Sequence, residues 1–165
     1  MNRKALLRVL GALTLVLAVG VTAEAQLPKN GTYRGTLGAR VVGTVNELEK
    51  GRVFFFGGFN GVFFNDVANG FVDKSSVDCP GVNDILNGLS LGSHGYCIVT
   101  DKDGDKAFAV WKGKDTTPNV GGGEFQWTGG TGKYSGLKGN NTYRYTGIGT
   151  TSAYTVVWEG AWQLP

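Results

Sequence analysis

Apolar and polar residues alternate with a period of two in the last stretch of the chain, from Tyr154 to Leu164. The odd positions of this stretch are mixed, whereas the even positions carry Tyr154, Val156, Trp158, Trp162 and Leu164. This period is typical of a strand with one buried face. We therefore expect a final strand with an apolar stripe on one side.

Short strands are expected along the rest of the chain as well. They are bounded by glycine-containing and polar turns, and no segment after residue 25 has convincing helical periodicity. The pattern predicts an all-β fold. The remaining expected strands are Thr32–Leu48, Val53–Phe64, Phe71–Asp78, Tyr96–Thr100, Lys106–Trp111, Glu124–Trp127, Lys133–Leu137 and Tyr143–Ile148.

Apolar side chains fall on both faces of the expected strand Val53–Phe64. One face carries Val53, Phe55, Phe59 and Phe63, and the other carries Phe54, Phe56, Val62 and Phe64. A strand that is apolar on both faces is usually covered on both, by the core inside and by something else outside. The outer cover is either another element of the same chain or a second copy in a homo-oligomer.

Glycines are dense between Gly121 and Gly139, where they alternate with short aromatic segments. Glycine is unfavourable inside regular structure, so such density marks bends, bulges and places where backbones approach closely. A sheet that coils tightly into a small barrel needs these features. The pattern favours one antiparallel barrel of about eight strands.

The N-terminus has the three parts of a secretory signal peptide. Asn2-Arg3-Lys4 forms a basic head, Ala5–Val21 is almost entirely apolar, and Ala23-Glu24-Ala25 is a small-residue cleavage site. Cleavage between Ala25 and Gln26 predicts a signal peptide over 1–25 and a single domain over 26–165. No stable membrane anchor is expected, because the charge-free run falls short of the roughly 20 residues that a span needs. The protein is therefore expected to be secreted or periplasmic.

Charge gives no indication of a nucleic-acid partner. The whole chain has 16 basic and 13 acidic residues, but the predicted signal peptide contains Arg3, Lys4, Arg8 and Glu24. Its removal leaves 13 basic and 12 acidic residues, so the high pI near 8.9 owes much to the signal peptide. No block of Lys or Arg marks a site for nucleic acid or an anionic membrane.

Cys79 and Cys97 are the two cysteines, and we expect them to form a disulfide. Asn87-Gly88 predicts a type I′ hairpin turn. If 87–89 forms a three-residue loop, Cys79 lies directly opposite Cys97, with Cβ atoms close enough to be bridged. Free thiols or a metal site are the alternatives. A metal site has few supporting ligands, since His94 is the only histidine.

The acidic loop Asp101–Asp105 resembles a calcium loop only loosely. Its glycine, Gly104, comes fourth, whereas an EF-hand loop needs glycine at the sixth position. Asp103-Gly104 is better interpreted as a second type I′ hairpin turn.

Few residues indicate catalysis. His94 follows Ser93 and could act as a base, although a solvated loop histidine is the simpler interpretation. Glu124 and Glu159 each lie in an expected strand beside aromatic residues. A carboxyl that points into a dry cavity would have a raised pKa and could act as an acid or a ligand contact, whereas an outward carboxyl is an ordinary surface residue. No convergent catalytic set, metal site or cofactor is predicted.

The segment Gly130-Thr-Gly-Lys-Tyr-Ser-Gly-Leu-Lys-Gly139, with Trp158-Glu159-Gly160 in the closing strand, resembles the second half of the allene oxide cyclase/dirigent type of β-barrel. The resemblance covers about the last third of 26–165. It is nearest to small exported bacterial members without an assigned activity. It implies an eight-stranded antiparallel barrel. Catalytic residues of the plant enzymes have no recognisable counterparts here, so none is assigned.

We expect an exported barrel that binds a small apolar ligand inside it, because a barrel of about eight strands has room for one small ligand or for side chains. The candidate ligand contacts are Trp127, Trp158, Trp162, Glu124 and Glu159. The three tryptophans would otherwise fill the interior. A cofactor-free cyclase or isomerase of the allene oxide cyclase/dirigent kind, and a purely structural envelope protein, are the alternatives.

Overall fold

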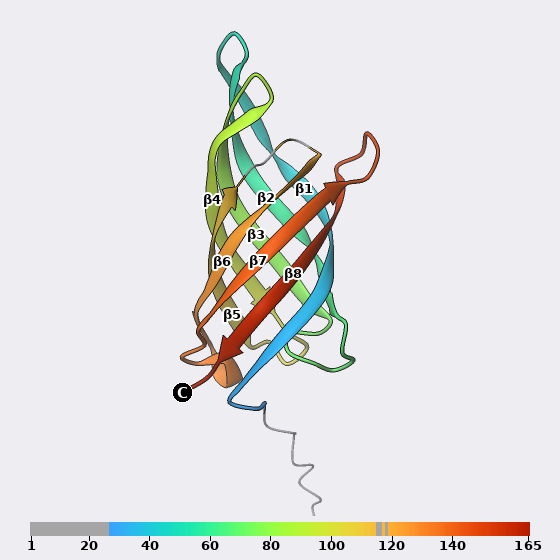
Figure 1. Cartoon of the computed structure of the whole chain (residues 1–165), viewed down its shortest axis with the longest axis vertical. Helices are drawn as coiled ribbons and strands as arrows, with labels where there is room; N and C mark the ends of the chain where they lie inside the picture. Colours follow the sequence, from blue (N-terminus) through green and yellow to red (C-terminus); the bar gives the residue numbers. More distant parts are fainter. Residues whose placement is uncertain (1–26, 115–116, 118) are drawn as a thin grey trace, which may run out of the picture.

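The computed structural model describes residues 27–114, 117 and 119–165. Eight strands form a closed barrel in which each strand pairs antiparallel with the next, and β8 pairs with β1 (Figure 1). This confirms the predicted all-β, eight-stranded barrel. The elements are β1 Asn30–Glu49, β2 Arg52–Asn65, β3 Ser75–Leu86, β4 Leu89–Thr100, β5 Lys106–Lys114, β6 Val120–Gly130, the 3₁₀ helix η1 Gly132–Tyr134, β7 Gly139–Gly147 and β8 Ala153–Gln163. The predicted signal peptide and its cleavage site between Ala25 and Gln26 lie outside the described residues.

Two of the expected strands are wrong. Lys133–Leu137 forms η1 and the turn after it, because Gly132 and Gly136 adopt positive φ angles of 50° and 74° that break any strand. The strand expected to begin at Phe71 begins at Ser75 instead. Phe71 belongs to the connection 66–74 between β2 and β3, and its apolar character reflects a position in the core.

Aromatic side chains close the end of the barrel that carries the connection 66–74, called here the closed end. Phe71 is only 4% exposed and stacks on Trp162 with ring centroids 4.7 Å apart. Its edge contacts with Trp127 and Tyr134 have centroid distances of 5.6 and 5.8 Å. The next residue, Val72, is 2% exposed and has a φ of 49°. A β-branched residue avoids this left-handed region, so the packing of 66–74 holds the backbone in a strained conformation.

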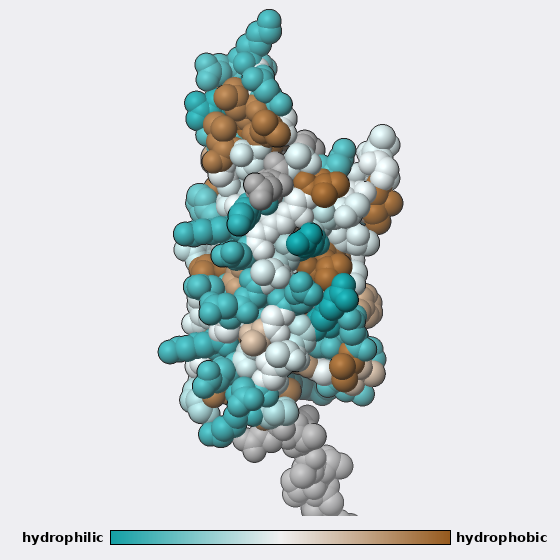
Figure 2. Space-filling view, in the orientation of Figure 1, coloured by the Kyte–Doolittle hydropathy of each residue, from teal (hydrophilic) through white to brown (hydrophobic). Residues whose placement is uncertain are grey.

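The strands β1 to β4 extend beyond the barrel at the opposite end, called here the open end (Figure 1). Pairing of β1 with β8 ends at Arg40, and pairing of β4 with β5 ends at His94. The two long hairpins continue as a four-stranded projection. Figure 2 shows apolar side chains gathered on it, beneath a hydrophilic tip. Exposed apolar residues on the projection are Val42, Val45, Leu48, Phe56, Leu89 and Leu91.

Most of the outer face of β2 is exposed. Phe56 is 62% exposed, Phe64 is 53% exposed and Val62 is 40% exposed. Among the described residues, cover by another element of the chain, one of the two alternatives, is therefore only partial, since Phe54 on the same face is half-buried. A homo-oligomer through Val53–Phe64 stays a prediction.

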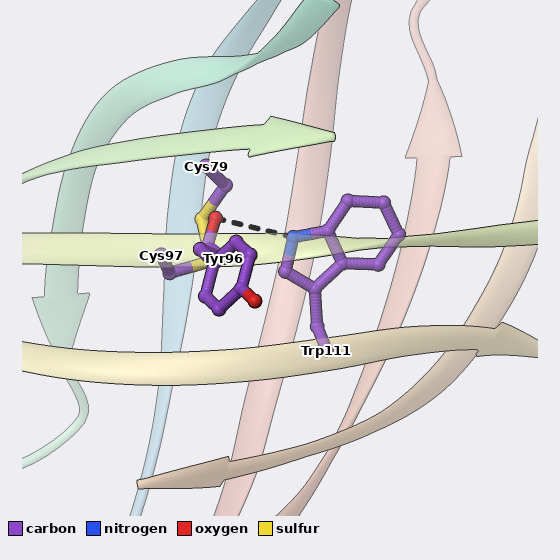
Figure 3. Close-up of a disulfide and its surroundings, with 4 residues drawn as sticks. All are labelled: Cys79, Tyr96, Cys97 and Trp111. Carbon is purple, nitrogen blue, oxygen red and sulfur yellow. Dashed lines mark hydrogen bonds between the residues drawn. A yellow bond between two sulfur atoms is a disulfide. The ribbon is translucent and has the colours of Figure 1, made fainter. Parts of the chain in front are cut away.

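Cys79 and Cys97 form the predicted disulfide, with their Cα atoms 4.0 Å apart (Figure 3). The hairpin turn has only two residues, Asn87 and Gly88, whose φ angles of 50° and 81° fit type I′. The predicted three-residue loop is therefore wrong, because Leu86 pairs with Leu89. A bulge in β4 next to Asp84–Ile85 supplies the extra residue and restores the expected register.

The loop Asp101–Asp105 also differs in detail from the sequence prediction. Gly104 has a φ of 87°, but Asp103 is not at positive φ, so the turn is not type I′. Five-residue hairpin loops are usually built around a type I turn instead. Two of its carboxylates form ion pairs with a lysine from outside the loop, since Lys133 Nζ lies 2.6 Å from a carboxylate oxygen of both Asp101 and Asp103.

The described residues contain no helix that is long and apolar enough to cross a bilayer.

We expect the disulfide to contribute about 3 kcal/mol to the free energy of unfolding, since it joins residues 18 positions apart in sequence. The double variant Cys79→Ala/Cys97→Ala should lose this contribution in guanidinium denaturation. Reduced wild-type protein should then unfold at a midpoint near that of the variant. Equal stability of the oxidised and reduced wild type would contradict the expectation.

Removing the Phe71 ring from the closed end should destabilise the barrel strongly. Phe71→Ala removes a buried ring from the closed end, and we expect it to cost about 3–5 kcal/mol in denaturation. Phe64→Ala is the matched control, because this ring lies on the exposed outer face of β2. The control should change stability by no more than about 0.5 kcal/mol. Similar losses for both variants would mean that Phe71 does not close the core.

Candidate ligand cavity

The half of the barrel next to the open end holds a cavity of about 340 Å³, and its lining continues onto the projection through Val45, Ile85 and Ser90. It lies above the aromatic core of the closed end. The side chains that line it come from the inner faces of all eight strands and are mostly apolar or aromatic. An eight-stranded barrel is normally narrow enough for side chains to fill it, so the open volume needs an explanation.

A row of glycines on one inner wall explains the open volume. Four glycines on neighbouring strands are paired directly with one another, so this wall has no side chains at this level. The ring of Phe55 lies where side chains on two of them would be, and the indole of Trp111 lies over the other two. Any larger residue in the row would overlap these rings or the neighbouring backbone. The row consists of Gly43, Gly57, Gly81 and Gly95.

Trp111 is held beside the disulfide. Its indole N–H donates a hydrogen bond of 3.2 Å to the backbone carbonyl of Tyr96 on the neighbouring strand (Figure 3). Cys79 and Cys97 form the next part of the same wall, and both are 5% exposed. The disulfide thus locks together the two strands that carry Gly81 and Gly95. Sequence reasoning did not identify Trp111 as a lining residue.

Trp158 forms the floor of the cavity together with Phe125. The Trp158 ring stacks on Phe63 at 5.2 Å and lies 5.1 Å from Phe125. Of the three tryptophans predicted from the sequence, only Trp158 lines the cavity. Trp127 and Trp162 are 3% and 5% exposed and lie in the aromatic core beneath this floor. They fill the interior, which was the alternative interpretation.

Tyrosines line the side of the cavity formed by β7 and β8. Tyr145 and Tyr154 pack around Phe59 of β2, with centroid distances of 5.9 and 5.3 Å. The Tyr145 hydroxyl donates a 2.6 Å hydrogen bond to the backbone carbonyl of Thr117. Tyr143 stands edge-on to Trp111 at 6.3 Å. Burial raises the pKa of Tyr143, and Tyr145 raises it further, so its phenol stays neutral.

A small polar group interrupts the apolar wall on β3 and β4. Asn83 and Ser93 are opposite one another in the ladder, and both line the cavity. Ser90, also in the lining, donates a hydrogen bond of 2.5 Å to Asn83 Oδ1. The sequence analysis did not identify these residues as a group. The signal that could have found them is the predicted hairpin, which places 83 on the inner face whenever Cys79 is there.

No Asp, Glu, His, Lys or Arg occurs among the described residues that line the cavity. Glu124 and Glu159 are exposed on the outer surface, where Glu159 lies 3.7 Å from Arg34. They therefore do not point into the cavity that Trp158 lines. The reason is strand parity, since each carboxylate is adjacent in sequence to an inward aromatic residue. His94 is also exposed, whereas Ser93 points inward, so the two cannot act together across the sheet.

Comparison with solved structures agrees with this architecture. The chain is similar to the structure of the pterocarpan synthase dirigent protein GePTS1, with a TM-score of 0.52 and 12% sequence identity over 86% of this chain and 94% of that one. The fold is dirigent-like. No protein-family model matches the chain, and no curated protein matches it in sequence. The expected likeness to small exported bacterial members stays a prediction.

At 12% identity the similarity to this dirigent protein concerns the fold alone. It supports the barrel part of the resemblance described above. The described residues that line the cavity must therefore be interpreted from their own chemistry, which is mostly apolar or aromatic and uncharged.

The buried tyrosines predict a loss of stability at alkaline pH. Burial raises the pKa of Tyr33, Tyr134 and Tyr143, and nearby carboxylates raise that of Tyr134 further. In the unfolded chain these phenols ionise near pH 10. Their contribution to stability is thus fully present below about pH 10 and is lost as the pH rises above it.

Urea denaturation between pH 9 and 11.5 measures this effect. Above about pH 10, Tyr143→Phe should make the decline shallower by about 1.4 kcal/mol per pH unit, because one proton fewer is released on unfolding, whereas near pH 9 the two proteins should show the same slope. An unchanged slope in this variant would show that the Tyr143 phenol ionises as readily in the folded state as in the unfolded chain.

Proposed function

We propose that this protein binds one small, uncharged and largely apolar molecule inside the barrel. The observation that carries the proposal is the cavity of about 340 Å³, whose described lining is mostly apolar and includes no charged side chain. An engineered apolar cavity of about 150 Å³ binds benzene, so this volume has room for a molecule of two or three rings or a chain of similar size. A charged ligand would be buried without a partner, which is unfavourable.

The opening of the cavity fits a binding role. The closed end is sealed by Phe71 and the core beneath Trp158, so a ligand would enter only past the long hairpins. The projection exposes apolar side chains beside this opening, and they would give an apolar molecule favourable contacts as it leaves water. The disulfide suggests an oxidising compartment and supports a secreted or periplasmic location.

A cofactor-free enzyme is the second candidate. The fold similarity to a protein described as a pterocarpan synthase favours it. A cyclase or isomerase would need a positioned acid or base within reach of its substrate. The described lining offers phenols such as Tyr143 but no carboxylate, imidazole or amine. We therefore place binding first.

Fluorescence titration with the neutral probe N-phenyl-1-naphthylamine tests the proposal. Wild-type protein should bind one probe molecule, and Ser93→Phe should weaken binding about tenfold or more, because the new ring occupies the cavity. His94→Phe is the matched control, since the adjacent side chain lies on the outer face and should leave the affinity unchanged. Thermal unfolding of each variant establishes that it is folded.

Native mass spectrometry of protein purified from its own cells should also reveal a bound small molecule of low polarity. Equal probe binding by both variants would contradict the proposed location of the site. Failure of any neutral apolar compound to bind or to stabilise the wild-type protein would contradict the proposed function.

A further inference from the structure

The polar group formed by Asn83, Ser90 and Ser93 is unusual in its surroundings. It lies on the inner face of the β3–β4 hairpin, between the glycine row and the opening of the cavity. The neighbours of Asn83 along the inner face of β3 are Gly81 and Ile85, and its partner on β2 is Phe55. Asn83 is half-buried in this wall, so its amide groups need hydrogen-bond partners in the protein, a ligand or solvent.

Only one half of the Asn83 amide has a partner. Oδ1 accepts a 2.5 Å hydrogen bond from the Ser90 hydroxyl, so the amide carbonyl is directed at Ser90. Nδ2, which has two N–H donors, makes no hydrogen bond to any described residue. Because Ser90 holds the oxygen, the part of the side chain that remains available to a ligand is a donor.

We infer that Asn83 recognises a hydrogen-bond acceptor on the ligand, such as a carbonyl, ether or hydroxyl oxygen. The inference rests on the proposed function and narrows it. The ligand is a neutral molecule whose apolar part occupies the space above Trp158 and whose acceptor group lies near the opening, at Asn83. Ser93, opposite Asn83 in the ladder, is close enough to contact the same group.

The lack of a basic side chain in the described lining agrees with an uncharged acceptor group on the ligand. A carboxylate or phosphate would also accept from Nδ2, but no Lys or Arg occurs in the described lining to neutralise it. Arg52, at the start of the neighbouring strand β2, already makes a paired contact with Asp84 through its guanidinium, at 2.7 and 3.1 Å. Asp84 lies on the opposite face of β3 from Asn83, so this pair is not part of the wall.

A pair of ligands with matched shapes tests the inference. 2-Acetylnaphthalene has a carbonyl acceptor, and 2-isopropylnaphthalene has a methyl group in its place. Asn83→Leu should weaken binding of the ketone about threefold to tenfold, as expected for one hydrogen bond, and should leave binding of the hydrocarbon unchanged or slightly tighter. Competition with the fluorescent probe gives the affinity of each ligand. The ratio of the ketone affinity to the hydrocarbon affinity is then compared between the variant and the wild type.

Two further variants separate this site from its alternatives. Ser90→Ala releases the Asn83 carbonyl, so the amide can rotate and the preference for the ketone should fall. Tyr143→Phe removes a different neutral donor from the lining and should leave the preference for the ketone intact.

Loss of the preference in Tyr143→Phe but not in Asn83→Leu would overturn the inference, as would equal weakening of both ligands in Asn83→Leu. Either result leaves the proposed function standing, because wild-type protein still binds the hydrocarbon. If wild-type protein binds neither ligand, the proposed function itself fails.

Discussion

The width of an eight-stranded barrel is the constraint on which the rest of this structure depends. Such a barrel holds about one layer of side chains from each wall, so an open space exists only where inward side chains are missing. Here they are missing at one level, where Gly43, Gly57, Gly81 and Gly95 meet across four strands. The aromatic rings of Phe55 and Trp111 cover part of this wall without refilling the barrel.

At the closed end, by contrast, large aromatic side chains fill the interior of the barrel. Phe71 reaches its position because the connection 66–74 folds back on itself. Asp73 holds this fold by accepting hydrogen bonds from the backbone N–H groups of Asn65 and Asn69, both 2.9 Å long. Burial raises the pKa of Asp73, but these hydrogen bonds lower it by more, so its pKa lies below the usual range. The carboxylate that accepts them thus helps to hold the strained backbone at Val72.

The overall fold could be predicted from the sequence because strand period, turn residues and glycine density all indicated the same class. The disulfide was also predictable, although by a partly wrong route. The three-residue loop and the observed two-residue turn with a bulge give the same pairing of Cys79 with Cys97, since both insert one unpaired residue. The predicted register of the two strands is therefore correct, although the predicted length of the turn is wrong.

The cavity itself could not be predicted, because it depends on which residues meet across strands. A glycine in one strand indicates only that a side chain is missing at that position. Whether several such glycines form one row depends on the registers of all four strands. The same ambiguity applies to Asn83, since a single polar residue in a strand is equally compatible with the outer face. For Glu124 and Glu159, alternation allowed either face, and the burial of Phe125 and Trp158 beside them decided it.

Strand length gives the cavity its asymmetry. The hairpins of β1 to β4 rise above the ends of β5 to β8, so the upper wall is built from one side only. That side supplies the glycine row and Asn83, whereas the lower side supplies the tyrosines and the Trp158 floor. A molecule in this space would be enclosed at its inner part and open to solvent at its outer part. An arrangement of this kind suits a ligand with an apolar body and one polar end, because each part then meets the environment in which it is most stable.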